Sequence, residues 1–282
     1  MHSSHGQTDD SRTDHDQTDH GRTEHNLTDR TVQANSFGAA AAAYERGRPE
    51  YPAAALDWLL AVAPEGRTAP RDVVDLGAGT GKLTRSLCAR GLAVTAVEPS
   101  EGMREQLTLA APGARVLAGS AEAMPLADAS ADVVLAAQAW HWVDTAVAVP
   151  EAARVLRPGG TLGLVWNIRD EREDWVAALG RLLTPHGAPA TGGEGVERLA
   201  DHPGLFGPVE RFDVEWSHTL TGDQLVDLVN SRSYVITMQA ADREALLAEV
   251  RELFDRHPAL VGRAHVELPY RTECYRARRA DR

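Results

Sequence analysis

The sequence predicts an α/β protein with a doubly wound, mostly parallel sheet, and three observations support this. Short apolar segments and helical segments alternate five times between residues 72 and 166. A glycine-rich turn follows the first apolar segment, and the turn Arg157-Pro158-Gly159-Gly160 precedes the fifth. Because parallel strands joined by right-handed crossovers are covered by helices on both faces, we expect an open α/β sandwich.

The first elements lead into the glycine turn. Pro52 suits the first position of a helix, and Leu56, Leu59 and Leu60 share one face of that helix. An apolar strand then enters the turn, and Leu83 and Leu87 continue with helical spacing. In chain order we expect helices at 39–44 and 52–62, a strand at 72–76 and a helix at 82–90.

Four more strands continue the sheet. The apolar segment before Glu98 has the length of a buried strand, and Ser100 is a residue type that caps helices. We expect strands at 93–97, 115–117, 132–137 and 161–166, with helices at 100–110 and 145–156.

The last third of the chain is less regular. Residues 173–183 are predicted to be helical, and residues 184–195 form a loop rich in Gly and Pro. Segments 209–220 and 265–278 are predicted to be strands that close the sheet as an antiparallel pair, which brings the sheet to seven strands.

Two helical segments lie between these last two strands, at 221–230 and 241–257. They are expected to form a lid, about residues 221–260, inserted before the last strand, where a substrate cover belongs. Residues 33–282 are therefore predicted to form one domain with its own lid.

The composition excludes several classes of partner. The chain has 29 Lys and Arg against 41 Asp and Glu, a formal charge of −12, which is the wrong sign for a phosphate backbone or an anionic bilayer. No apolar run approaches the roughly 18 residues that a membrane helix needs, and the polar N-terminus has no signal-peptide core. Cys88 and Cys274 are too few for a disulfide scaffold. We expect a cytoplasmic protein with no nucleic-acid or membrane partner.

Residues 1–32 differ from the rest of the chain. Residues 1–30 carry seven acids, three bases and five of the eleven histidines, with few apolar side chains to offset the entropy of ordering. From Thr13 they follow a five-residue repeat that matches neither helix nor strand. Either His and carboxylate alternate here to bind a metal ion, or this is low-complexity sequence ahead of the domain. We expect a disordered tail, and no metal site elsewhere.

The glycine turn is the main candidate binding site, because ligands of open α/β sheets bind beyond the carboxyl ends of the strands. A phosphate-binding loop would need glycine where Leu76 stands and Ser or Thr where Leu83 stands. A dinucleotide fingerprint would need glycine in place of Lys82, which makes an NAD site the weaker alternative. The remaining pattern is Asp-x-Gly-x-Gly-x-Gly from Asp75, with Glu98 ending the next strand to accept both hydroxyls of an adenosine ribose. This pattern indicates S-adenosylmethionine as the cofactor.

Four motifs stand in a fixed order along the chain. They are Asp75-Leu76-Gly77-Ala78-Gly79-Thr80-Gly81, Ala96-Val97-Glu98-Pro99-Ser100, Gly119-Ser120-Ala121-Glu122-Ala123-Met124-Pro125-Leu126 and Arg154-Val155-Leu156-Arg157-Pro158-Gly159-Gly160. In this order they resemble class I S-adenosylmethionine-dependent methyltransferases, which implies a Rossmann-like methyltransferase fold.

Four further segments narrow the resemblance. They are Tyr44-Glu45-Arg46-Gly47-Arg48-Pro49-Glu50-Tyr51-Pro52, Gln138-Ala139-Trp140-His141-Trp142, Trp166-Asn167-Ile168-Arg169-Asp170 and Leu268-Pro269-Tyr270-Arg271-Thr272. They are similar to the small-molecule branch that contains trans-aconitate methyltransferase and related carboxylate and thiol methyltransferases. The resemblance spans about residues 36–279.

The resemblance implies a cofactor site larger than the turn itself. It implies that the turn holds the methionine part of the cofactor and that Glu98 binds its ribose. Met103 either packs against the adenine or is ordinary core, and Arg48 either reaches the cofactor carboxylate or is a surface arginine. The predicted cofactor residues are Tyr44, Arg48, Asp75, Gly77, Ala78, Gly79, Thr80, Gly81, Glu98, Pro99, Met103, Ser120, Ala121, Glu122, Gln138 and Ala139.

Methyl transfer is a direct displacement, so the protein mainly aligns the reactants and excludes water. His141 is the candidate catalytic residue, either as a general base or as a positioning residue. Arg232 either pairs with a substrate carboxylate or forms a surface ion pair. Trp140, Trp142 and Trp166 either contact the substrate or cofactor or belong to the hydrophobic core. The predicted substrate-binding residues are Trp140, His141, Trp142, Trp166, Arg232 and Tyr234.

We therefore expect an enzyme that transfers a methyl group from S-adenosylmethionine to an oxygen or sulfur of a small molecule, a natural product or a metabolite. Two alternatives stay open. The acceptor atom is carbon or nitrogen, or the protein binds the cofactor without transferring its methyl group.

Overall fold

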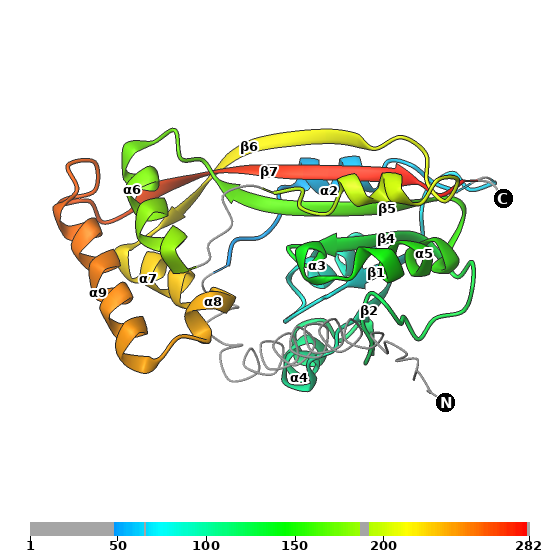
Figure 1. The fold of residues 1–282 in the computed structure, drawn as a ribbon, viewed down its shortest axis with the longest axis horizontal. Coiled ribbons are helices and arrows are strands. Elements are labelled where there is room, and N and C mark those ends of the chain that lie inside the picture. The colour runs from blue at the N-terminus through cyan, green and yellow to red at the C-terminus, as the bar shows by residue number, and fades with distance from the viewer. Residues whose placement is uncertain (1–47, 65, 187–191, 281–282) are drawn as a thin grey trace, which may run out of the picture.

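The computed structural model describes residues 48–64, 66–186 and 192–280 (Figure 1). The predictions for the tail at 1–32, the helix at 39–44 and Tyr44 lie outside the described residues. No helix within the described ranges is long and apolar enough to cross a bilayer.

The described residues form a seven-stranded sheet in the order β3-β2-β1-β4-β5-β7-β6. The first five strands run parallel, whereas β7 lies antiparallel to both β5 and β6. The predicted fold class is therefore confirmed, including the antiparallel pair that closes the sheet. The strands are β1 (Asp72–Leu76), β2 (Ala93–Val97), β3 (Arg115–Leu117), β4 (Ala131–Ala137), β5 (Leu156–Arg169), β6 (Glu210–Leu220) and β7 (Val266–Arg278).

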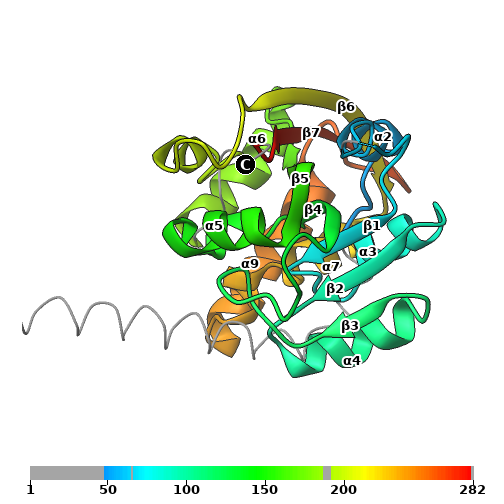
Figure 2. The same cartoon turned by 90° about the vertical axis from the view of Figure 1, so that its right-hand side faces the viewer.

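Helices cover both faces of the sheet, as Figure 2 shows. On β4, Val133 packs with α2 and α3 on one face, and Val134 packs with α5 on the other. This alternation explains why the strands read as continuous apolar runs. The helices around the sheet are α2 (Ala53–Leu59), α3 (Lys82–Cys88), α4 (Glu101–Ala110) and α5 (Thr145–Val155).

The last part of the chain adds a separate helical lobe. The lobe lies at one end of the long strands β5, β6 and β7, at the left of Figure 1. Its helices are α6 (Asp174–Leu183), α7 (Gly222–Asn230), α8 (Ser233–Ile236) and α9 (Ala240–Arg256). Side chains of α6, α7 and α9 share a hydrophobic cluster with the ends of β6 and β7. The predicted insertion before the last strand is therefore present, and α6, which precedes β6, packs with it.

Three local predictions differ from the structure. Residues 157–160 belong to β5, where they bulge out of the ladder, because Ala131 pairs with Leu156 and Val133 already pairs with Thr161. Pro52 caps α2 instead of opening it, since its ψ of 140° is extended, and the helix ends at Leu59 rather than near residue 62.

The third concerns Ser100, which occupies the N-cap position of α4 but whose side chain accepts no hydrogen bond from the helix. Its backbone N–H donates instead to a carboxylate oxygen of Glu98, at 2.9 Å. The start of α4 is thus tied to the candidate ribose-binding residue.

Candidate active site

A cleft opens at the carboxyl ends of β1 and β4, where the strand order reverses. Its walls come from the segment before α2, the glycine turn, the ends of β4 and β5, the start of β7 and the helical lobe. The lining residues are Arg48, Pro49, Tyr51, Asp75, Gly77, Ala78, Lys82, Leu83, Ala137, Gln138, Asn167, Arg232 and Tyr270.

The glycine turn adopts backbone conformations that favour glycine. Gly77, Gly79 and Gly81 have φ values of 67°, 58° and 92°, in the left-handed region. A Cβ on Gly77 would lie 2.7 Å from the Cβ of Ala139, which is too close for carbon atoms. The turn therefore brings bare backbone to the floor of the cleft.

Glu98 directly follows β2, and its side chain reaches this turn. Its Oε2 accepts a hydrogen bond from the Gly79 N–H at 2.9 Å, and its Oε1 accepts one from Ser100. Burial holds the pKa of the Glu98 carboxyl above its ordinary value, and the hydrogen bonds from the two backbone N–H groups offset part of this rise. Since a carboxylate offers about four acceptor positions, two remain for a ligand.

Asp75 is the penultimate residue of β1 and is fully buried. Its Oδ2 accepts a hydrogen bond from the Thr84 hydroxyl at 2.5 Å, and its Oδ1 has no hydrogen-bond partner among the described residues. Burial, with the nearby Glu98 charge, raises the pKa of Asp75 to about 7. The cleft floor thus holds an unused acceptor whose charge changes near neutral pH.

A network of amides joins the cleft walls. Gln138, in the left-handed region with a φ of 56°, donates from its side chain to the Asn167 carbonyl at 3.1 Å. The Asn167 amide donates to the Glu50 carbonyl at 3.2 Å, and its oxygen accepts from Thr272 at 2.7 Å. A non-glycine residue in this conformation is strained and often marks a functional site.

His141 follows β4 and is held by Trp166. The Trp166 indole N–H donates to His141 Nδ1 at 3.4 Å. Burial, with the Arg48 charge, lowers the pKa of His141 to about 4. Because an indole only donates, Nδ1 must be unprotonated, and the neutral ring carries its proton on Nε2. At neutral pH His141 is therefore a hydrogen-bond donor.

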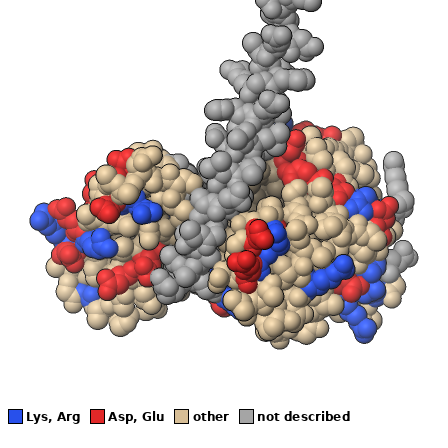
Figure 3. Space-filling model, turned by 90° about the horizontal axis from the view of Figure 1, so that it is seen from below, with Lys and Arg blue, Asp and Glu red and all other residues tan. Residues whose placement is uncertain are grey.

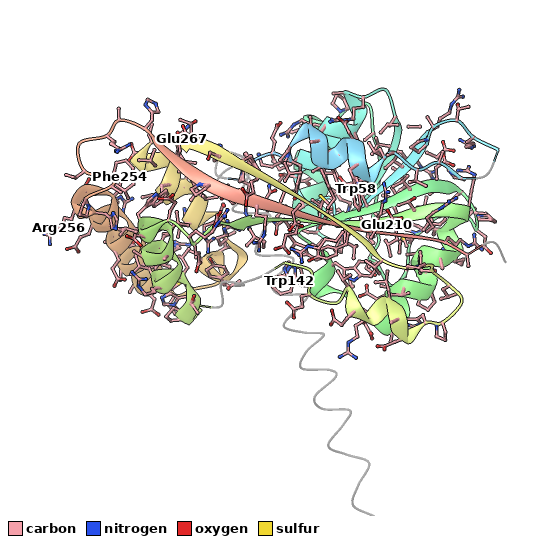
Figure 4. The ribbon with its side chains drawn as sticks, turned by 90° about the horizontal axis from the view of Figure 1, so that it is seen from above. Trp58, Trp142, Glu210, Phe254, Arg256 and Glu267 are labelled. Carbon is pink, nitrogen blue, oxygen red and sulfur yellow. The ribbon has the colours of Figure 1, made fainter. Side chains whose placement is uncertain are left out.

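The three clustered tryptophans have different surroundings. Trp140 is fully buried in the core, so it presents no surface to a ligand in this arrangement. Trp166 is also buried and contacts His141. Trp142 is 39% exposed, with its ring centroid 4.9 Å from that of His141. Figure 4 shows Trp142 on the sheet body, whereas Phe254 and Arg256 lie in the helical lobe.

The residues predicted to contact the adenine lie outside the cleft lining. Met103 and Ala121 are buried among apolar side chains. Glu122 accepts a hydrogen bond from the backbone N–H of Asp144 at 2.8 Å, at the start of α5. Ser120 forms a short bridge with Ala123, and Pro99 is exposed. Their adenine contacts stay predictions.

Of the residues in the lobe, Arg232 lines the cleft and is 9% exposed. Arg48 Nη2 donates to the carbonyl of the neighbouring Ser231 at 3.4 Å, which joins the segment before α2 to the lobe. The hydroxyl of Tyr234 is buried and has no hydrogen-bond partner among the described residues.

Sequence reasoning missed four polar or aromatic residues of the cleft. The amide of Asn167 was detectable, since it lies near the end of β5 as Gln138 follows β4. Lys82 was also detectable, because it directly follows the glycine turn. The spacing of Tyr51 and Tyr270 does not indicate the cleft, because the tertiary fold brings them there. Within the described ranges, no group of three or more His, Cys, Asp or Glu could hold a metal ion.

Comparisons with known proteins identify the family. A family profile described as a methyltransferase domain matches residues 74–164. An uncharacterized methyltransferase of Mycobacterium tuberculosis is 52% identical over 242 residues, which cover 86% of this chain and 95% of that protein. The chain belongs to the class I S-adenosylmethionine-dependent methyltransferases.

Other similarities agree with this family. A solved structure of a candidate type II methyltransferase from Anaeromyxobacter dehalogenans has a TM-score of 0.60 and 29% identity, over 83% of this chain and 97% of that one. A malonyl-[acyl-carrier protein] O-methyltransferase of Methylococcus capsulatus is 38% identical over 133 residues, 45% of this chain and 48% of that protein. The resemblance of the methyltransferase to the trans-aconitate branch stays a prediction.

Proposed function

We propose that this methyltransferase binds S-adenosylmethionine at the glycine turn and transfers a methyl group to an oxygen or sulfur of a small molecule. The observation that carries the proposal is the pairing of Glu98 with the turn, whose Gly79 N–H it accepts at 2.9 Å. A buried carboxylate with unused acceptor positions, next to bare backbone, suits an adenosine ribose and a methionine chain.

Two polar groups of the cleft lining, Asp75 and Arg48, and the buried Glu98 behind the glycine turn match the polar parts of this cofactor. The free positions of Glu98 would accept hydrogen bonds from the ribose hydroxyls. The unpartnered Oδ1 of Asp75 would accept one from the ammonium group, and the Arg48 guanidinium, which also lines the cleft, would face the carboxylate. The cofactor supplies an electrophilic methyl carbon bonded to a sulfonium.

The chain's own residues then have a simple task. His141 already uses Nδ1 to accept the Trp166 bond and keeps a proton on Nε2. It is therefore suited to donate a hydrogen bond to the acceptor and orient it, and poorly suited to remove a proton. This supports the positioning role and favours acceptors that arrive ionised, such as carboxylates and thiolates.

Oxygen as the acceptor atom has further support from similarity. The relative from Methylococcus capsulatus is an O-methyltransferase, although it matches less than half of this chain. The helical lobe, through Arg232, borders one side of the cleft. This enclosed side is consistent with an acceptor that is a small molecule.

Calorimetric titration with S-adenosylhomocysteine tests the cofactor site. We expect the wild-type protein to bind it and Glu98→Gln to bind about tenfold or more weakly, because a charge-assisted hydrogen-bond acceptor is lost. The matched control is Glu105→Gln, which changes an exposed carboxylate on α4, the helix that follows Glu98. This variant should bind S-adenosylhomocysteine as the wild type does. Failure of the wild-type protein to bind would contradict the proposal.

Methyl transfer itself needs a turnover measurement. S-adenosylhomocysteine should form from S-adenosylmethionine only when an acceptor is added, and a panel of carboxylates, thiols, amines and phenols would show which atom is methylated. Cofactor binding without turnover on any acceptor would favour the non-catalytic alternative.

A further inference from the structure

Two arginines and two tyrosines meet where the sheet joins the helical lobe. Arg169 ends β5 and pairs directly with Tyr270 of β7 in the sheet register. Arg232 lies between α7 and α8, and Tyr234 lies in α8. Arg169 interacts electrostatically with the other three, and both Arg232 and Tyr270 line the cleft. We call these four residues the junction cluster.

In the part of the chain that the structure describes, no acidic side chain pairs with the arginines of the junction cluster. Among the described residues, neither Arg169 nor Arg232 forms an ion pair within 4 Å. The exposed Glu171 is the weakest of the neighbours that influence Arg169. Burial and the like charge of Arg232 both lower the pKa of Arg169. Two guanidinium groups buried close together repel each other, so binding of an anion between them is electrostatically favourable.

Within the described ranges, three polar atoms of the cluster also lack hydrogen-bond partners. They are Nε of Arg169 and the hydroxyl groups of Tyr234 and Tyr270, all buried. Buried donors without partners are rare in folded proteins, and each calls for an explanation. Here all three belong to one cluster at the edge of one cleft, and all three can donate to an oxygen atom.

The outer surface shows a different charge pattern. In Figure 3, Lys and Arg side chains are interspersed with Asp and Glu over both the lobe and the sheet body. The surface residue Arg172 pairs with Asp170 and with Glu215, and Arg256 pairs with Glu252. Unpaired guanidinium groups are thus a feature of the junction cluster and not of every arginine in the chain.

We propose that the junction cluster binds an oxyanion of the methyl acceptor, a carboxylate or a phosphate, so that the enzyme acts on small acids. This proposal rests on the proposed function, because the cluster shares its cleft with the candidate cofactor site. The two guanidinium groups supply charge and forked N–H donors, and the two phenols supply O–H donors.

The cluster and the candidate partner of the cofactor carboxylate use different arginines. Arg48 lies before α2 and influences His141, and its Nη2 bonds the carbonyl of Ser231, next to Arg232, whereas Arg169 lies beside Arg232. Asp75 and the glycine turn lie at β1, and the cluster lies at the ends of β5 and β7 beside the lobe. Arg48, Lys82 and Arg232 are thus the cationic residues that line the cleft, and Arg169 stands behind Arg232 on the side of the lobe.

Titration of the protein saturated with S-adenosylhomocysteine tests the proposal, with malonate and inorganic phosphate as probes at constant ionic strength. We expect binding of at least one oxyanion and no binding of malonamide, which has the shape of malonate without its charge. Malonate binding would assign carboxylic acids as acceptors, and binding of phosphate alone would assign phosphate esters. If neither oxyanion binds, the proposal is wrong.

Substitutions locate the bound oxyanion. Arg169→Gln and Arg232→Gln should each weaken its binding about tenfold or more, while the affinity for S-adenosylhomocysteine stays within about twofold. Arg256→Gln, an exposed arginine of α9, is the matched control and should change neither. Equal oxyanion affinity in all three variants would contradict the proposal even where the cofactor binds normally. If the wild-type protein does not bind S-adenosylhomocysteine, this result would count against the proposed function. Titration of the cofactor-free protein with malonate and phosphate would then still test the junction cluster.

Tyrosine-to-phenylalanine variants separate binding from a structural role. Tyr270 stacks on Trp216 with ring centroids 5.3 Å apart, an arrangement that Phe can keep. Because the hydroxyls of Tyr234 and Tyr270 have no hydrogen-bond partner among the residues that the structure describes, Tyr234→Phe and Tyr270→Phe should unfold at the same or a higher temperature without ligand. Their oxyanion affinity should nevertheless fall several-fold. Lower stability together with unchanged oxyanion affinity would assign these hydroxyls to the fold and overturn their place in the site.

Discussion

At the scale of single residues, the chemistry of His141 is decided by its neighbour. The Trp166 N–H occupies Nδ1 at 3.4 Å, and burial lowers the pKa of the ring to about 4. A histidine that stays neutral with Nε2 protonated can hold an acceptor in place but offers no free lone pair to a proton.

This assigns an expected outcome to two His141 variants. Gln also carries an N–H donor, so His141→Gln should keep kcat within about fivefold, whereas His141→Ala should lose about tenfold or more. The measurement is S-adenosylhomocysteine formation over a range of pH. A loss in the Gln variant as large as in the Ala variant, with disappearance of a pH-dependent limb, would assign proton transfer to His141.

Asp75 makes the stability of the ligand-free protein depend on pH. Burial raises its folded pKa to about 7 from an ordinary value of 3.8, so the folded protein keeps a proton that the unfolded chain releases. The contribution of Asp75 to the free energy of unfolding is fully present below about pH 4 and is lost as the pH rises through 7. The total loss is at most roughly 4 kcal/mol.

Urea unfolding of the wild type and Asp75→Asn between pH 4.5 and 8 would measure this effect. The stability of the wild type relative to the variant should fall as pH rises. His141 acts in the opposite direction, because its folded pKa is lowered, but it is present in both proteins and cancels in the difference. A difference that does not change with pH would show that Asp75 ionises as an ordinary carboxyl.

At the scale of elements, the turn between β1 and α3 depends on glycine for two separate reasons. Gly77 has a left-handed φ, and its missing Cβ leaves room for Ala139. Gly91, after α3, has a similar φ of 76° but nothing within 4 Å of the Cβ position. These two glycines separate backbone strain from crowding.

We expect Gly91→Ala to reduce the free energy of unfolding by about 1 kcal/mol, which is the strain of a left-handed alanine. Gly77→Ala should cost more, about 3 kcal/mol, because the Cβ of Ala139 cannot swing away and the backbone must move. Urea denaturation measures both variants. Equal losses would mean that the turn relaxes without strain around Gly77.

At the scale of the whole molecule, the methyltransferase has one continuous sheet but separate hydrophobic clusters. The cluster in the lobe joins α6, α7 and α9 to the far ends of β6 and β7, and the clusters on the sheet faces use other residues. The cleft lies where the two parts meet. Elements with their own core can open locally without unfolding the rest.

Leu225→Ala in α7 tests this separation, since Leu225 is fully buried in the lobe cluster. We expect a loss of about 2–5 kcal/mol in the stability of the lobe and faster amide exchange over 222–256, while β1, β2 and β4 stay protected. The affinity for S-adenosylhomocysteine should change little, because Glu98 and the turn belong to the sheet. Leu87→Ala, in the sheet cluster on α3, is the control and should speed exchange across the sheet.

Much of the fold and part of the site follow from local sequence. Apolar runs of strand length, helical spacing and glycines between them predict the strands, the order of the elements and the turn at Gly77, because these features depend on neighbours in the chain. Glu98 at the end of the next strand is predictable for the same reason, since parallel strands end at one edge. The bulge at 157–160 is not, because it depends on how β5 pairs with β4.

The remaining parts of the site depend on contacts between distant segments. The hydrogen bond from Trp166 to His141 spans 25 residues, and the bond from Arg48 to Ser231 spans 183. Tyr270 reaches the cleft only because β7 turns back beside β5. The sequence by itself determined the family, the fold and the glycine turn. Tertiary packing decided which arginines meet without an acid and which histidine nitrogen keeps its proton, since burial and partners set the charge of a side chain.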